Sequence, residues 1–229
     1  MKEQNEEKNL EIGGVIAQTE QFLQKNKKML IIVGCIIIGV ALCIWAFVEG
    51  YSKPHQRAAA EEIFAAEQWF GEGSYEKALN GNDQYMGFLD IIDEYGHTKS
   101  GNLARYYAGI CQLNLGQFDE AIDNLKSYKG KDDITPAQAT MLIGDAYAEL
   151  GNNEEAVAYY MKAAKKADNF ITTPTALWKA GMMYLALGNN DAAVKNFETI
   201  KEKYPESSEW NEVDKYLTYA KSGKLPTEE

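Results

Sequence analysis

The sequence YYAGICQLNLGQFDEAIDNL at residues 106–125 returns twice in altered form further along the chain. The second copy is MLIGDAYAELGNNEEAVAYY at residues 141–160, and the third is WKAGMMYLALGNNDAAVKNF at residues 178–197. The copies are spaced by 35 and 37 residues, a period that is typical of solenoids built from stacked helix pairs. The repetition therefore predicts an all-α fold for most of the chain.

Residues of the same kind recur at fixed positions in the three copies. About fourteen helix-compatible residues end at a glycine, which can supply the positive φ that follows many helices. Small residues at two further positions allow two antiparallel helices to approach closely. One pair alone cannot bury its apolar face, so the pairs must stack. The recurring residues are the inner glycines Gly109, Gly144 and Gly181, the turn glycines Gly116, Gly151 and Gly188, the alanines Ala121, Ala156 and Ala193, and the bulky residues Leu125, Tyr160 and Phe197.

An earlier, degenerate unit precedes the three clear copies. The interval from Ala78 to Ala121 is 43 residues, which is too long for the period and predicts an insertion within residues 80–88. The unit fits the frame of the other three through Ala66, Trp69, Gly73, Tyr75 and Ala78. About four helix pairs are therefore expected within a repeat domain at residues 58–221.

The end of the repeat domain should be closed by one more helix. Residues 207–221 carry apolar side chains at helical spacing, with Ser207 or Ser208 as the expected N-cap. Such a capping helix shields the apolar face of the last pair, as terminal repeats must. Residues 222–229 are expected to form a flexible tail.

A second feature is the apolar run MLIIVGCIIIGVALCIWAFV at residues 29–48, which contains no charge and no proline. As a helix it would be about 30 Å long, the thickness of a bilayer's hydrocarbon core. A buried core helix rarely has so long an unbroken apolar run. A cleaved signal peptide would need a shorter run and small residues at its end, whereas residues 45–48 read WAFV. Lipidation at Cys35 is not expected either, because it would need a longer apolar run before that cysteine. We therefore expect an uncleaved transmembrane helix.

The flanks of this run suggest its orientation. Three lysines precede it, namely Lys25, Lys27 and Lys28, and cations favour the cytoplasmic side. Residues 1–28 are then a cytoplasmic segment, residues 49–57 a juxtamembrane link, and the repeat domain lies outside the membrane. Cys35, Gly39 and Cys43 recur every four residues, a spacing that would let another membrane helix pack along them. The alternative is that these three residues face lipid.

Charge and motifs exclude several classes of function. Residues 1–53 carry equal numbers of lysines and glutamates, so the whole net charge of −11 falls on the remainder. An acidic domain repels phosphate backbones, and nucleic-acid binding is not expected. The three cysteines form no C-x-x-C pair, and the two histidines, His55 and His97, are far apart in sequence. No nucleotide-binding or hydrolase motif occurs. We expect no enzyme, no metal and no cofactor.

The repeats resemble the tetratricopeptide repeat family. Leu-Gly is followed five residues after the glycine by alanine in all three copies, at residues 115–121, 150–156 and 187–193. Tyr147, Tyr184 and Pro205 fit the family pattern as well. The family's early tryptophan is replaced by Arg105, Thr140 and Leu177. The resemblance implies antiparallel helix pairs whose concave face binds other proteins.

The order of the parts resembles a second family, the ancillary subunit of the bacterial Sec translocon. That resemblance implies a single-pass inner-membrane protein with a periplasmic repeat domain. It also implies translocon subunits, exported client polypeptides and periplasmic chaperones as partners. An alternative from another class is a structural scaffold for one fixed envelope complex. Self-association through the repeats or the anchor is a third possibility.

The first helix of each pair would line the concave face. Its candidate residues are largely aromatic, methionine and aliphatic, which suits the binding of varied apolar segments. A groove that clamps carboxylates would need several inward Lys, Arg or Asn residues, and few are found. The alternative for each residue is packing within the chain. The candidates are Tyr106, Ile110, Leu113, Met141, Asp145, Ala148, Glu149, Trp178, Met182 and Leu185.

Overall fold

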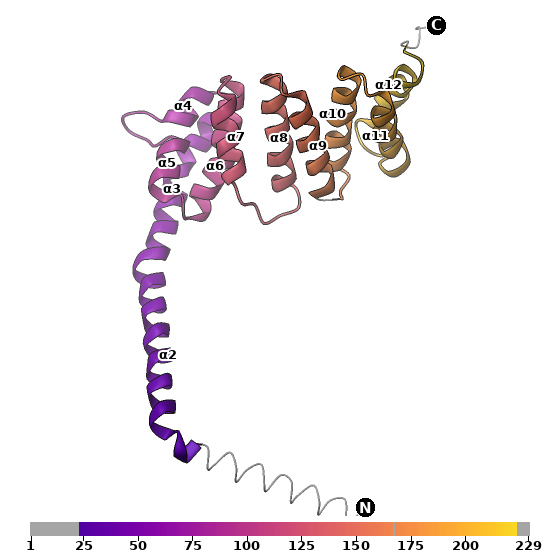
Figure 1. The fold of residues 1–229 in the computed structure, drawn as a ribbon. Coiled ribbons are helices and arrows are strands. Elements are labelled where there is room, and N and C mark those ends of the chain that lie inside the picture. The colour runs from indigo at the N-terminus through magenta and orange to yellow at the C-terminus, as the bar shows by residue number, and fades with distance from the viewer. Residues whose placement is uncertain (1–22, 167, 224–229) are drawn as a thin grey trace, which may run out of the picture. The chain divides into compact units, whose positions relative to one another are not determined.

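The computed structural model describes residues 23–166 and 168–223. Across these residues the chain forms helices and turns and contains no β-strand (Figure 1), which confirms the predicted all-α fold. The chain divides into two compact units, Met1–Pro54 and His55–Glu229. Each unit is described by itself below. The predictions for residues 1–22 and 224–229 lie outside the described residues.

The first unit contains the predicted membrane helix. Helix α2 spans Lys27–Phe47 and buries none of its residues. It is followed by a π-helical turn, η1, at Val48–Ser52. This stretch forms part of the one described helix that is long and apolar enough to cross a membrane. Cys35 and Cys43 are exposed, and a Cβ added to Gly39 would meet nothing within 4 Å. The predicted packing stripe is therefore open along its length in the isolated chain.

The second unit is a row of antiparallel helices that pack side by side in chain order from α5 to α12 (Figure 1). Three regular pairs follow the degenerate first one, and each pair matches one copy of the sequence repeat. The helices from Lys53 onward are α3 (Lys53–Gly71), α4 (Tyr75–Asn80), α5 (Phe88–Tyr95), α6 (Lys99–Asn114), α7 (Phe118–Ser127), α8 (Thr135–Glu149), α9 (Asn153–Lys166), α10 (Thr172–Ala186), α11 (Asn190–Lys203) and α12 (Trp210–Ser222).

Glycines shape the regular pairs in two ways. The turn glycines Gly116, Gly151 and Gly188 have φ values of 75°, 76° and 73°, a left-handed conformation that L-residues with a Cβ rarely adopt. The inner glycines lie against the bulky residue of the partner helix. A Cβ on Gly109 would lie 2.5 Å from Cγ of Leu125. The two helices of a pair therefore approach as closely as the sequence pattern predicts.

The degenerate first unit contains the predicted insertion. Its second helix is divided into α4 and α5, and the interruption runs from Gly81 to Gly87. An aromatic cluster closes the unit against α6. The ring of Tyr107 stacks on Phe88 at a centroid distance of 5.2 Å and lies 4.9 Å from the ring of Phe70. Ala59, Ile63 and Ala66 bury the inner face of α3 in the same core.

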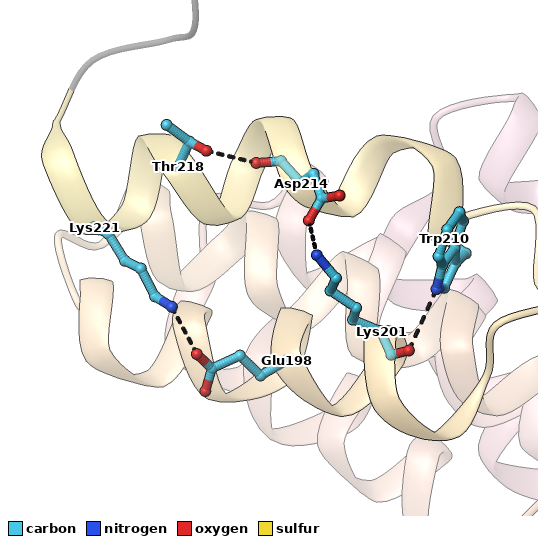
Figure 2. Close-up of polar contacts among 6 residues, drawn as sticks. All are labelled: Glu198, Lys201, Trp210, Asp214, Thr218 and Lys221. Carbon is cyan, nitrogen blue, oxygen red and sulfur yellow. Dashed lines mark hydrogen bonds and ion pairs between the residues drawn. The ribbon is translucent and has the colours of Figure 1, made fainter.

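Helix α12 covers the last pair and is the predicted capping helix. Lys221 pairs with Glu198 of α11 at 2.7 Å, and Lys201 of α11 pairs with Asp214 (Figure 2). Beneath these pairs Val213 and Ala220 are buried against the core of the last pair. The predicted N-cap was wrong. The helix begins at Trp210, after the buried Ser207, because a turn bonded from Ser207 N–H to the Tyr204 carbonyl precedes it.

Candidate functional site

A groove lies between the first helices of neighbouring pairs. Helix α8 contacts both α6 and α10, and the space beside it forms an open pocket of about 580 Å³. Five of the residues predicted for the concave face line this pocket, namely Ile110, Leu113, Asp145, Ala148 and Glu149. Apolar walls are completed by Phe118 and Leu142, and the remaining lining residues are Asn114, Gly116, Tyr160 and Lys179.

A polar network stands at the centre of the groove. Lys179 Nζ of α10 lies 2.7 and 2.8 Å from the two carboxylate oxygens of Asp145 on α8. The Tyr160 hydroxyl of α9 donates to Asp145 Oδ1 at 2.8 Å. Burial raises the pKa of Tyr160, and the neighbouring Asp145 charge raises it further. The phenol therefore donates its hydrogen bond to Asp145, and three helices are joined through one carboxylate.

A smaller recess adjoins the groove along α10. It has a volume of about 240 Å³ and is lined by the predicted residues Trp178 and Met182 together with Met183 and Ala186. Tyr160 and Lys179 line both spaces. The polar network therefore lies between the groove, whose walls are mostly aliphatic, and the recess, which is lined by methionine. Methionine side chains adapt to irregular partners because they are unbranched and polarizable.

The remaining predicted residues contact the chain itself. Tyr106 donates a hydrogen bond to Gln138 Oε1 at 3.1 Å, and its ring lies 5.2 Å from that of Tyr128. Met141 packs against the core of α8, α9 and α10, and Leu185 packs against the C-terminal core. Trp178 also contributes to that core, with its ring 5.0 Å from Tyr216 in a T-shaped contact.

Sequence reasoning missed Lys179, which is the cation of the groove. Lys179 occupies the repeat position that Tyr107 and Leu142 hold in the other two copies. The sequence did contain a signal for this residue, namely a lysine at a repeat position that is otherwise apolar. Helical periodicity placed Trp178 and Met182 on the concave face instead. Periodicity does not account for a long side chain that reaches into the groove from a neighbouring position.

Two histidines and a cysteine also lie outside the groove. His55 and His97, far apart in sequence, lie with their rings 5.5 Å apart. Within residues 23–166 and 168–223, no three His, Cys, Asp or Glu side chains are grouped to hold a metal ion.

Cys111 is buried on α6, and burial raises the pKa of its thiol to about 12. A thiol that stays protonated at neutral pH is a poor nucleophile.

Comparison with known protein families identifies the repeat unit. A family model described as "T7SS, ESX-1 secretion system protein EccA1, N-terminal domain" matches residues 75–213. The match covers more than half of the chain. The chain belongs to this EccA1 N-terminal domain family. The matched residues run from the start of α4 into α12, so they include the whole groove.

Solved structures with the same fold are tetratricopeptide-like. The structure of MamA aligns with a TM-score of 0.55 at 18% identity, covering 69% of this chain and 83% of MamA. The nearly identical TPR-like repeats of a kinesin light chain from Podospora anserina align with a TM-score of 0.55 at 16% identity. That alignment covers 72% of this chain and 86% of the kinesin light chain structure. No curated protein sequence matches the chain. The EccA1 N-terminal domain family member described here therefore has a tetratricopeptide-like fold.

Proposed function

We propose that the chain is a membrane-anchored protein whose repeat unit binds segments of other proteins in the groove between α6, α8 and α10. The groove itself carries this proposal. It is open, it has apolar walls for side chains of a bound segment, and Glu149 lies exposed at its lining. The hydrogen bonds and the ion pair among Asp145, Lys179 and Tyr160 link three helices at its centre. A preformed groove loses little entropy when it binds.

The anchor in this proposal is the apolar segment at residues 29–48, and the binding domain is residues 58–221. The length and composition of the helix support the anchor. Lysines before it support a cytoplasmic N-terminus, with the repeat unit on the periplasmic side of a bacterial inner membrane. A tether of this kind raises the concentration of the groove at the membrane surface.

The partners that we favour are newly exported polypeptides and subunits of the Sec translocon. Three observations support this choice: the resemblance in the order of anchor and repeats, the adaptable methionine-lined recess, and the family description, which names a secretion system protein. We propose an accessory role without catalysis. The same family description also favours a second candidate, a fixed structural subunit of one secretion complex.

Photocrosslinking in living cells distinguishes these candidates. A photoreactive amino acid is placed at Ile110 in the groove or at Met182 in the recess of the full-length protein. A matched position is Lys195, which is exposed on α11 and lines neither space. We expect a range of exported proteins together with translocon subunits from the first two positions and not from the third. A single dominant adduct indicates the fixed scaffold. Identical adducts at all three positions, or none beyond the protein itself, overturn the groove assignment.

A further inference from the structure

A second cleft lies on the repeat unit between α7 and α9. It has a volume of about 110 Å³, and its lining includes Lys126 of α7 and Lys162 and Lys166 of α9. Ala139 and Ile143 of α8 form an apolar floor. This cleft was not predicted from the sequence.

The cleft and the groove use opposite sides of α8. The helix contributes Leu142, Asp145 and Glu149 to the groove and Pro136, Thr140 and Ile143 to the cleft. Successive residues of an α-helix are rotated by roughly 100° about its axis. The side chains of α8 that line the groove and those that line the cleft therefore point in directions nearly half a turn apart. A ligand in the cleft therefore does not compete for space with a ligand in the groove.

Aromatic rings and two hydroxyl groups hold the three ammonium groups around the cleft. Lys126 Nζ donates to the Tyr147 hydroxyl at 3.1 Å, and it lies 5.4 Å from that ring's centroid. Lys162 Nζ lies 5.4 Å from the ring of Tyr159. Lys166 Nζ donates to Thr140 Oγ1 at 3.2 Å. The hydrogen bond to Tyr147 is the largest influence on Lys126 and raises its pKa, so this group stays charged.

None of these lysines is neutralised by an acid of the described chain. The ion pairs found in residues 23–166 and 168–223 use four other lysines, at positions 53, 179, 201 and 221. Three unpaired positive charges therefore line one cleft in a part of the protein whose net charge, with these lysines included, is −11. Charge repulsion makes such a cluster unfavourable by itself, and an anion would relieve it.

We propose that the cleft between α7 and α9 binds carboxylate side chains from an acidic segment of a partner protein. Its volume equals about four water molecules at roughly 30 Å³ each, which suits one carboxylate and its methylene stem. The apolar floor and the Tyr159 ring accommodate the stem, and the ammonium groups bind the charge. An anionic membrane or a nucleic acid presents negative charge over a wide area, which the net negative charge of residues 54–229 repels. A short acidic segment contacts the cleft alone.

The test uses the full-length protein in dodecyl maltoside micelles and a fluorescein-labelled hexaglutamate peptide, with binding followed by fluorescence anisotropy. We expect saturable binding that weakens with added salt. The variant with Lys126→Gln and Lys162→Gln should bind at least fivefold more weakly. The variant with Lys126→Arg and Lys162→Arg keeps the charge and should bind within about twofold of the unmodified protein.

The matched control carries Lys195→Gln and Lys215→Gln. Lys215 lies over the Tyr216 ring at 5.5 Å, so this control removes the same charge and a comparable cation–π contact outside the cleft. It should bind within about twofold of the unmodified protein, and circular dichroism shows whether each variant is folded. An equal loss in the control, or no peptide binding at all, overturns the proposal. Three competitors are tested as well: millimolar inorganic phosphate, phosphatidylglycerol in the micelle and single-stranded DNA. If any of them fully displaces the peptide, the proposal is overturned, because the cleft then binds that anion and not an acidic segment.

Discussion

A Cβ on Gly181 would lie 2.6 Å from Cε1 of Phe197, so α10 and α11 can pack as they do only if this position lacks a side chain. The preceding pair repeats the relationship, with the same 2.6 Å between a Cβ on Gly144 and Cε1 of Tyr160. The sequence repeat thus couples one glycine to one bulky residue sixteen positions later. The ring occupies the space that the glycine leaves.

Substitution of this glycine should weaken the last pair. We expect Gly181→Ala to lower the free energy of unfolding by about 1–3 kcal/mol, since the added methyl group overpacks a buried contact. Urea unfolding followed by circular dichroism measures the change. Gly71→Ala is the control, because a Cβ there meets nothing within 4 Å. Equal midpoints for the two variants would contradict the close approach.

The Asp145–Lys179 pair should show measurable coupling. A double-mutant cycle of Asp145→Asn and Lys179→Met should give an interaction energy of about 1 kcal/mol, because the pair is partly exposed and solvent screens it. The same cycle on the exposed pair Lys221–Glu198 should give less. Additive effects at Asp145 and Lys179 would mean that the network does not fix the groove.

Alkaline pH should destabilise the protein through Cys111. The folded state raises the pKa of this thiol from its ordinary 9.0 to about 12. The stabilising contribution is therefore complete below pH 9 and is lost as pH rises toward about 12. We expect the urea midpoint to fall between pH 8.5 and pH 10.5. Cys111→Ala should show a shallower fall over the same interval, and an equal slope in both proteins would disprove the assignment.

Acid should weaken the start of α8 through Asp132. Its carboxylate accepts hydrogen bonds from the backbone N–H groups of Ile134 and Thr135 at 2.9 and 2.6 Å and from the Thr135 hydroxyl. The bond from the Thr135 hydroxyl is the largest cause of a pKa of about 2. The contribution is present above pH 3.8 and is lost as pH falls through about 2.

Asp132→Ala should therefore lower the melting temperature at pH 7. Asp132→Asn should lower it less, because Asn169 makes the equivalent bonds to the N–H groups of Ile171 and Thr172 at 2.8 and 2.7 Å. Differential scanning calorimetry of the two variants measures both shifts. Identical melting temperatures for the alanine variant and the unmodified protein would show that this turn does not stabilise α8.

Periodicity allowed the sequence to predict the helix pairs and half of the groove. Ile110 and Asp145 share one repeat position and both line the pocket. Lys179 and the cleft lysines were not predicted, because their placement depends on side-chain reach between separate helices. Lys179 lies 34 positions from Asp145, and Lys126 lies 21 positions from Tyr147. The start of α12 was misplaced because the two adjacent serines match the N-cap preference, whereas backbone-bonded turns over residues 205–209 separate α11 from α12.

Helix α12 limits where further helix pairs can be added to the row. It covers the face on which a further pair would stack, and Trp178 and Tyr216 seal the junction. A further helix pair cannot stack on α11 where α12 lies, so the row of pairs ends at this helix. Duplication of a helix pair inside the row would lengthen the groove and leave this cap intact.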